Sequence, residues 1–296
     1  MIAIVDSGST KSDWVIVDPE GKELFRTKTI GLNPYFITSG DVVKEVCKND
    51  ELIKAADEVT HVFFYGAGCS GPHYNETIKK GLDEVFLKSQ NLIEHDLLAA
   101  AYACFRGRPV IACILGTGSN SCYFDGKKIR EETPSLAFIL GDEGSGSHFG
   151  KRVLRAYFLK KMPKRLSESF EKQFRLTRYE MDKNVYGNPF ANAYLASFSR
   201  FVVDHKHDPF IQKMIYDSLN DFIVNQILVY PEARTVELNF IGSIAHYYEG
   251  TLAVVASEYH LKIGEIVRKP IDNIVNYHAI HIIPDLKKNP KVVARQ

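Results

Sequence analysis

The chain has 296 residues, 45% of them hydrophobic and 25% charged, and a formal net charge of only +1, so it reads as an ordinary globular protein of one large or two average domains. The near balance of charge gives no support for binding to nucleic acid or to an anionic membrane. The five cysteines lack CxxC spacing, and no apolar run is long enough for a signal peptide or a membrane span, so we expect a cytoplasmic protein with reduced thiols.

The first thirty residues predict three strands joined by tight turns. A β-branched run over residues 2–5 enters a Gly/Ser turn, and an alternating run follows over residues 13–18. A Pro-Glu-Gly turn then precedes a third strand over residues 23–29. Alternation of apolar and polar residues between turn residues is typical of strands in hairpins.

The next segments alternate between strand and helix. A strand over residues 61–65 ends in Gly-Ala-Gly, and a helix is expected over residues 75–89. A short strand over residues 91–94 leads to an alanine-rich helix over residues 97–105. Strands that alternate with helices indicate an α/β protein with mixed sheets.

The opening pattern of strands and turns occurs a second time from Val110. An apolar run enters the glycine-rich turn 116–120, and a second run reaches Asp125-Gly126 before a third strand. Asp-Gly between alternating runs is a strong hairpin signal. Two copies of one pattern predict a chain built from duplicated halves.

Amphipathic stretches dominate the rest of the chain. Helices are expected over residues 150–161, 189–204, 209–230 and 270–277, and a strand over residues 236–241. We place the division between the halves near Ala99 and expect the final helix to pack back on the first half. Residues 284–296 are polar and basic with two prolines, which predicts a loose tail.

Each glycine-rich turn is a candidate phosphate site. Glycine lets the backbone approach a ligand closely, successive amides form a concave anion site, and the hydroxyls of Ser9 and Thr10 add donors. Two such turns could hold a nucleoside triphosphate, whereas the alternative is a pair of ordinary hairpin turns. Neither turn is a Walker A loop, which ends in GK[ST] and opens a helix, and neither is a dinucleotide-binding GxGxxG turn.

Three acidic positions follow apolar runs and have two interpretations each. Asp6 could hold Mg²⁺ through water or could cap its turn. Asp96 could accept a proton from a substrate hydroxyl or could cap the following helix. Asp142 and Glu143, among glycines and serines, could bind sugar hydroxyls or cap the helix that follows.

Six segments occur in a characteristic order: IVDSGSTKSD, GLNPY, EHD, ILGTGSNS, LGDEGSG and FIGSIA. Over roughly residues 2–280 this set resembles the BadF/BadG/BcrA/BcrD-type ATPase family and is most similar to its N-acetylglucosamine kinase branch. The resemblance implies a duplicated actin/hexokinase-like (ribonuclease H-like) fold of two domains with an interdomain cleft. The domains would be residues 1–98, completed by a helix within 265–280, and residues 99–264, followed by a polar tail over 281–296.

The resemblance also implies an ATP-dependent, Mg²⁺-dependent kinase that phosphorylates an amino sugar, with N-acetylglucosamine to its 6-phosphate as the first expectation. Contacts to the ATP phosphates are implied for Gly8, Ser9, Thr10, Lys11, Gly116, Thr117 and Gly118. Contacts to the adenosine are implied for Ala196, Gly242 and Ser243. Contacts to the sugar are implied for Asn33, Asp96, Ser119, Asn120 and Asp142, with Asp96 as the catalytic base.

One departure from the branch leaves the sugar open. Where the branch has a glycine-rich GGxG segment against the N-acetyl group, residues 134–137 read Pro-Ser-Leu-Ala. The alternatives are therefore a kinase for N-acetylmuramate, another amino sugar or a plain hexose. An iron–sulfur ATPase activator would need a cysteine in the segment GDEGSGSHFG, which has none, and a sugar-binding regulator would need a helix-turn-helix segment that is not evident. The expected partner is a small-molecule sugar, and a homodimer is compatible with these expectations.

Overall fold

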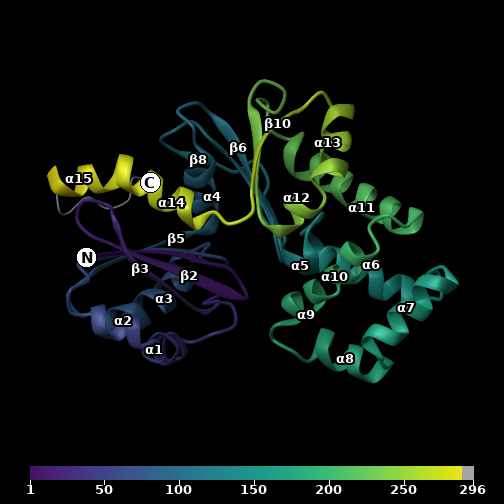
Figure 1. Ribbon diagram of the computed structural model, residues 1–296, viewed down its shortest axis with the longest axis horizontal. Helices are drawn as coiled ribbons and strands as arrows, with labels where there is room; N and C mark the ends of the chain where they lie inside the picture. The colour runs from purple at the N-terminus through teal and green to yellow at the C-terminus, as the bar shows by residue number, and fades with distance from the viewer. Residues whose placement is uncertain (289–296) are drawn as a thin grey trace. The chain divides into compact units, whose positions relative to one another are not determined.

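The computed structural model describes residues 1–288 and contains two compact units (Figure 1). Unit 1 comprises residues 1–108, 124–129 and the described residues from Lys269 onward. Unit 2 comprises residues 109–123 and 130–268. Each of the two five-stranded sheets is covered by helices, so the predicted α/β class with duplicated halves is confirmed.

The sheet of unit 1 has the strand order β3-β2-β1-β4-β5. Its strands are β1 (Ile2–Ser7), β2 (Lys11–Val17), β3 (Glu23–Ile30), β4 (His61–Gly66) and β5 (Gln90–His95). The first three strands are antiparallel, whereas β1, β4 and β5 run parallel, with Ser7 opposite Gly66 and Gly66 opposite His95. The carboxyl ends of three parallel strands therefore meet at one edge, where α/β sheets bind ligands.

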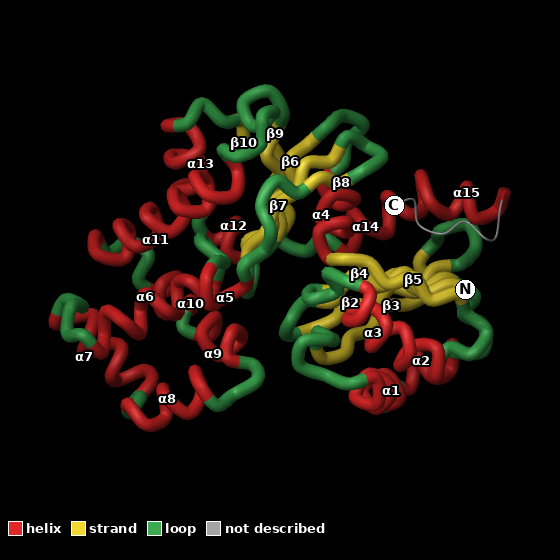
Figure 2. Tube along the Cα trace, turned by 180° about the vertical axis from the view of Figure 1, so that it is seen from behind, coloured by secondary structure: helices red, strands yellow, loops and turns green. Residues whose placement is uncertain are grey.

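Helices lie on both faces of this sheet (Figure 2). They are α1 (Ser39–Cys47), α2 (Asp50–Ala55), α3 (Pro72–Val85), α4 (Asp96–Cys104), α14 (Ile271–Tyr277), the π-helix η2 (His278–Ile282) and α15 (Ile283–Lys288). Helix α4 is buried from Leu97 to Cys104 and packs on β1, β4 and α14, which explains why its sequence is rich in small alanines. The helices α1 and α2 were not predicted.

The chain after Pro284 is more ordered than the sequence suggested. The predicted loose tail is instead helical from Ile283 to Lys288, because Ile283 and Leu286 are buried. Residues 289–296 of the predicted tail lie outside the described residues.

The sheet of unit 2 has the order β10-β9-β6-β7-β8. Its strands are β6 (Val110–Leu115), β7 (Ser119–Phe124), β8 (Ile129–Arg130), β9 (Glu237–Ile241) and β10 (Lys262–Val267). Strands β6 and β9 are parallel, with Ile114 opposite Ile241. Their carboxyl ends therefore deliver Gly116 and Gly242 to the same edge of the sheet.

Ten helical segments of unit 2 follow β8. They are α5 (Ala137–Leu140), α6 (Gly146–Phe158), α7 (Lys164–Phe174), α8 (Arg178–Tyr186), α9 (Ala191–Ser197), α10 (Ser199–Asp204), α11 (Pro209–Phe222), the π-helix η1 (Ile223–Ile227), α12 (Ser243–Tyr247) and α13 (Glu249–Glu258). Of these, α12 and α13 pack on the strands of the sheet. The helix predicted over residues 189–204 is two helices that meet at Phe198. The helix expected from residue 150 begins earlier, at Gly146, where Ser145 caps it by accepting a hydrogen bond from the His148 amide (3.2 Å).

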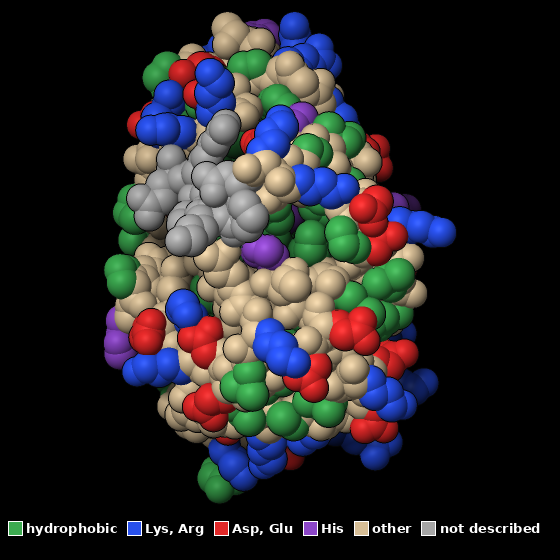
Figure 3. Space-filling view, turned by 90° about the vertical axis from the view of Figure 1, so that its left-hand side faces the viewer, with side chains coloured by type: hydrophobic (Ala, Val, Ile, Leu, Met, Phe, Trp, Pro, Cys, Tyr) green, Lys and Arg blue, Asp and Glu red, His purple; other side chains and the backbone are tan. Residues whose placement is uncertain are grey.

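The surface agrees with the balanced composition. On the face shown in Figure 3, basic and acidic side chains are interspersed rather than gathered by sign. Within the described part of the chain, no helix is both long enough and apolar enough to cross a membrane.

Candidate active site

The first candidate phosphate turn is fixed by two buried serines. The turn joins β1 to β2, and the Gly8 amide donates to the Lys11 carbonyl (2.9 Å). The Ser12 hydroxyl lies 2.8 Å from the Ser7 hydroxyl and 2.9 Å from the Ile30 carbonyl oxygen. The Ser7 hydroxyl also accepts a hydrogen bond from the Leu32 amide (3.0 Å). These bonds tie the turn to the chain that leaves β3.

Gly31 supports the same turn by close backbone contact. A Cβ atom at this position would lie 2.3 Å from the Gly8 carbonyl oxygen, 2.5 Å from the Ser9 carbonyl carbon and 2.6 Å from the Thr10 nitrogen. Only a residue without a side chain fits here, because these three neighbours are backbone atoms. No role was predicted for Gly31 from the sequence, although it begins the GLNPY segment.

Asn33, a predicted sugar residue, is buried against this turn. Its Nδ2 donates to the Ser9 hydroxyl (3.3 Å), and its Oδ1 accepts from the Tyr35 amide (3.0 Å). A Cβ on Gly68 would lie 2.4 Å from this Oδ1, so the Gly-Ala-Gly segment after β4 packs on the carboxamide. The amide group has two N–H donors, and only one of them is used in these bonds.

Asp96 lies at the carboxyl edge of the sheet, directly after β5. It is the first residue of α4, and the capping side chain is its neighbour His95, whose Nδ1 accepts from the Leu97 amide (3.4 Å). The interpretation of Asp96 as the helix cap is therefore wrong. The Asp96 Oδ1 lies 3.3 Å from the His95 Nδ1, and the Asp96 side chain is 25% exposed, so its carboxylate is accessible.

Asp6 is a carboxylate in an unfavourable electrostatic environment. Its pKa is raised from 3.8 to about 7, mainly by burial and then by the nearby charges of Asp96 and Asp13, against the opposing effect of Lys11. The Lys11 ammonium forms an ion pair with Asp13. Asp6 and Asp96 thus bring two carboxylates to one sheet edge, where a cation would relieve their repulsion.

The carboxylates of Asp6 and Asp96 suit a hydrated magnesium ion. Mg²⁺ binds carboxylate oxygens, keeps several waters and takes few protein ligands. Among residues 1–288, no group of three or more His, Cys, Asp or Glu side chains could hold a metal on its own. Asp6, acting through water as predicted, therefore fits Mg²⁺ better than a metal that needs a full protein cage.

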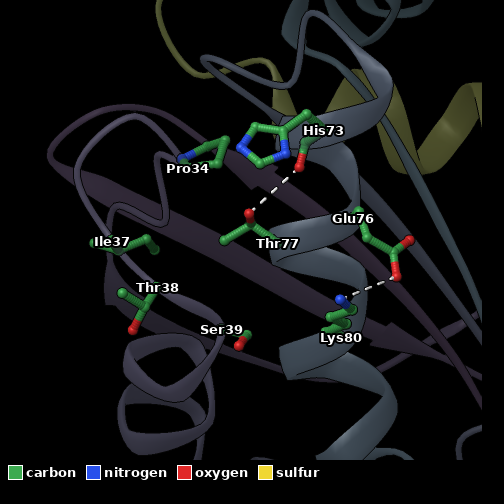
Figure 4. Close-up of a pocket in the computed structure, with 8 residues that line it drawn as sticks. All are labelled: Pro34, Ile37, Thr38, Ser39, His73, Glu76, Thr77 and Lys80. Atoms are coloured by element: carbon green, nitrogen blue, oxygen red, sulfur yellow. Dashed lines mark hydrogen bonds and ion pairs between the residues drawn. The ribbon is translucent and has the colours of Figure 1, made fainter.

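A pocket of about 380 Å³ lies beside the Asn33 segment, between the start of α1 and the first turns of α3 (Figure 4). It is lined by Pro34, Ile37, Thr38, Ser39, His73, Glu76, Thr77 and Lys80. Within it, the Thr77 hydroxyl donates to the His73 carbonyl (3.4 Å), and Lys80 pairs with Glu76 (3.8 Å). None of the predicted site residues lines this pocket, and Pro34 connects it to the predicted sugar residue Asn33.

In unit 2 the second glycine-rich turn packs on the first turn of α6. The Gly116 amide donates to the Gly118 carbonyl (2.9 Å) within the turn. The amides of Gly146 and Ser147 donate to the carbonyls of Gly116 (2.8 Å) and Thr117 (3.0 Å). The GDEGSG segment therefore holds the turn in place.

Three predicted sugar residues of unit 2 come together, and each is also used internally. The Asp142 carboxylate accepts a hydrogen bond from the Ser119 amide (3.1 Å), and a Cβ on Gly118 would lie 2.9 Å from its Oδ2. The Ser119 hydroxyl donates to the Glu143 carbonyl (2.7 Å). Asn120 is buried, and its Oδ1 accepts from the Ser121 amide (2.9 Å).

The predicted adenosine residues adjoin the same turn. Gly242 has a φ of +116°, and a Cβ there would lie 2.3 Å from the Leu115 carbonyl oxygen, just before Gly116. A Cβ on Gly146 would lie 3.2 Å from the Ala196 Cβ. Ser243 follows as the first residue of α12. Residues from three distant segments of the chain thus surround one turn.

The Pro-Ser-Leu-Ala departure forms the start of a short, exposed apolar helix. Ala137 has a φ of +55°, a left-handed conformation that glycine adopts more easily. Leu136, Ile139 and Leu140 are all more than half exposed. The Lys151 ammonium donates to the Phe138 carbonyl and anchors this segment beside Asp142. The backbone thus keeps a glycine-like conformation although the glycine is absent.

Comparison with solved structures identifies the class of protein. The chain is 36% identical to a putative N-acetylglucosamine kinase from Porphyromonas gingivalis, with a TM-score of 0.87, and the match covers 95% of this chain and 99% of the other. A protein of the same description from Chromobacterium violaceum is 15% identical (TM-score 0.67, covering 93% and 98%). A ROK-family glucokinase from Streptomyces griseus, in complex with glucose and AMPPNP, is 15% identical (TM-score 0.54, covering 92% and 96%).

The two more distant matches show the fold alone, which is that of actin-like sugar kinases. The Porphyromonas match, over nearly the full length of both chains, shows the family: the protein belongs to the N-acetylglucosamine kinase-like family of sugar kinases. Comparison with protein-family models gave no match, and comparison with curated proteins gave none either.

Proposed function

We propose that the protein transfers the γ-phosphoryl group of ATP to a hydroxyl of N-acetylglucosamine, with the 6-hydroxyl as the first expectation. The observation that carries this proposal is the full-length match to the Porphyromonas protein. The order of the six motifs in this chain further supports membership of the BadF/BadG/BcrA/BcrD-type ATPase family. The two tight glycine turns support the use of a nucleotide, because turns of this kind let a phosphate approach the backbone closely.

The proposed reaction needs one base and well-placed positive charge. Asp96 would accept the proton of the attacking hydroxyl while the new O–P bond forms and the bond from the γ-phosphorus to ADP breaks. The spare N–H donor of Asn33 would bind a sugar hydroxyl, and Ser119, Asn120 and Asp142 are the proposed sugar residues of unit 2. Bound Mg²⁺ would neutralise charge on the phosphates, held by Asp6 through water.

The remaining proposed residues bind the nucleotide. The phosphate contacts come from Gly8, Ser9, Thr10 and Lys11 in unit 1 and from Gly116, Thr117 and Gly118 in unit 2. The adenosine contacts come from Ala196, Gly242 and Ser243. Within each unit, these residues adjoin turns that backbone hydrogen bonds hold in shape.

The decisive experiment is a coupled assay of Mg-ATP turnover with N-acetylglucosamine, N-acetylmuramate, glucosamine and glucose. We expect N-acetylglucosamine to have the highest kcat/KM. Asp96→Asn keeps the size of the side chain but cannot accept the proton, so kcat should fall by roughly 10²–10⁴-fold with little change in the KM for ATP. Glucose as the preferred substrate would overturn the amino-sugar assignment, and near-normal turnover of the Asn variant would overturn the role of Asp96.

A further inference from the structure

An aromatic side chain, Tyr35 at the end of the GLNPY segment, lies beside the proposed sugar residue Asn33, and the proposed mechanism gives it no role. Tyr35 is bonded to Asn33 through its own backbone amide, which donates to the Asn33 Oδ1 (3.0 Å). Tyr35 is nevertheless 47% exposed. A partly exposed ring therefore lies next to a buried carboxamide.

The exposed ring is held in place rather than left free to rotate. Its hydroxyl lies 3.0 Å from the Ser70 hydroxyl, in the segment between β4 and α3. The ring of Tyr74, on α3, meets it edge to face, with centroids 4.4 Å apart and planes at 79°. Tyr35 is therefore fixed by its backbone, its hydroxyl and a neighbouring ring. Because the side chain is already ordered, it loses less conformational entropy on binding a ligand than a flexible side chain does.

Pyranose rings have a surface that matches such a side chain. Their hydroxyls point outward around the ring, whereas the axial C–H groups leave apolar faces that pack on aromatic rings, and sites for small ligands combine aromatic surface with a few polar groups. Asn33 supplies a polar N–H donor, and Tyr35 supplies the aromatic surface two residues later.

We propose that Tyr35, braced by Tyr74 and Ser70, is a platform on which one face of the sugar ring stacks while Asn33 binds a hydroxyl at the ring edge. This inference rests on the proposed sugar kinase function. In this proposal, Tyr35 contacts the apolar face of the sugar. Tyr35 therefore contributes to the affinity for a pyranose and does not affect the binding of ATP.

The test replaces the ring while keeping an apolar side chain. In Tyr35→Leu the stacking surface is lost, and both the Kd and the KM for N-acetylglucosamine should rise about tenfold. The KM for ATP should not change. Tyr35→Phe keeps the ring and loses only the bond to Ser70, so it should remain close to the parent. Tyr179→Leu is the matched control, because Tyr179 is 75% exposed on α8 of unit 2.

Saturation-transfer NMR gives a readout that a merely structural role would not change. With the parent, N-acetylglucosamine should receive saturation mainly at the axial protons of one ring face, on carbons 3 and 5 or on carbons 2 and 4. Tyr35→Leu should remove this asymmetry. A parent that binds the sugar, together with a Leu variant of equal affinity and equal pattern, would overturn the platform alone. A parent that neither binds nor phosphorylates any sugar would overturn the proposed function and the platform with it.

Discussion

Substituting Gly31 by alanine should disable the first candidate phosphate turn without unfolding the protein. A Cβ at this position would lie 2.3 Å from the Gly8 carbonyl oxygen, whereas ordinary van der Waals contact begins at 3.4 Å, so the two segments must separate by about 1 Å. No rotation of a side chain can relieve the contact, because the closest neighbours are backbone atoms of residues 8–10. Gly31 does not have a positive φ, so the substitution adds this steric contact and no backbone strain.

A displacement of about 1 Å in a group that positions a substrate can cost on the order of 100-fold in rate. We therefore expect kcat/KM for ATP to fall by about two orders of magnitude in Gly31→Ala. Overpacking of this kind also costs about 1–3 kcal/mol of folding free energy. Steady-state kinetics with varied ATP measure the first effect, and urea unfolding followed by circular dichroism measures the second.

Gly71→Ala is the matched control in the same unit. Gly71 has an extended φ of −174°, and a Cβ there would have no neighbour within 4 Å, so this variant should retain the activity of the parent. If Gly31→Ala keeps the parental kcat/KM for ATP, the turn at residues 8–10 is either not part of the nucleotide site or can move without loss of activity. Either result would refute the expectation that close packing at Gly31 keeps the turn active.

Two further predictions concern stability. His278 is fully buried with its Nε2 bonded to the Tyr65 hydroxyl (2.8 Å), and burial lowers its pKa from 6.5 to about 3. Because the unfolded chain binds this proton more readily, the free energy of unfolding should decrease as the pH falls from 6.5 towards 3. In His278→Phe, the free energy of unfolding measured with urea should depend less on pH between 6.5 and 3. An unchanged slope would contradict the lowered pKa of His278. Ala137→Gly should raise the free energy of unfolding by about 1 kcal/mol, since glycine relieves the left-handed backbone at φ +55°; a less stable variant in thermal unfolding would show that Ala137 is not strained.

Much of the local structure could be predicted from the sequence because it depends on local rules. The hairpins of both halves follow from alternating residues around turn glycines, and the structure confirms them as β1–β3 and β6–β8. Asp6 and Asp96 were predicted to end strands because each follows an apolar run, and the structure places Asp6 next to the end of β1 and Asp96 directly after β5. Their functional roles stay predictions. The missed helix α1 also had a local signal, since Thr38 and Asp41 form a capping box that we did not use.

Other features depended on contacts between residues far apart in the chain. The sequence shows glycines at positions 31, 68 and 242, and only the folded chain shows that they press on Gly8, Asn33 and Leu115 respectively. Likewise, His95 rather than Asp96 caps α4, and the Asp142 carboxylate holds Ser119, because side-chain geometry in the folded state decides which acceptor meets which amide. Periodicity and turn residues encode a segment's own conformation. The distance between two segments depends on packing of the whole unit, so the residues that hold the two turns in shape became visible only in the tertiary structure.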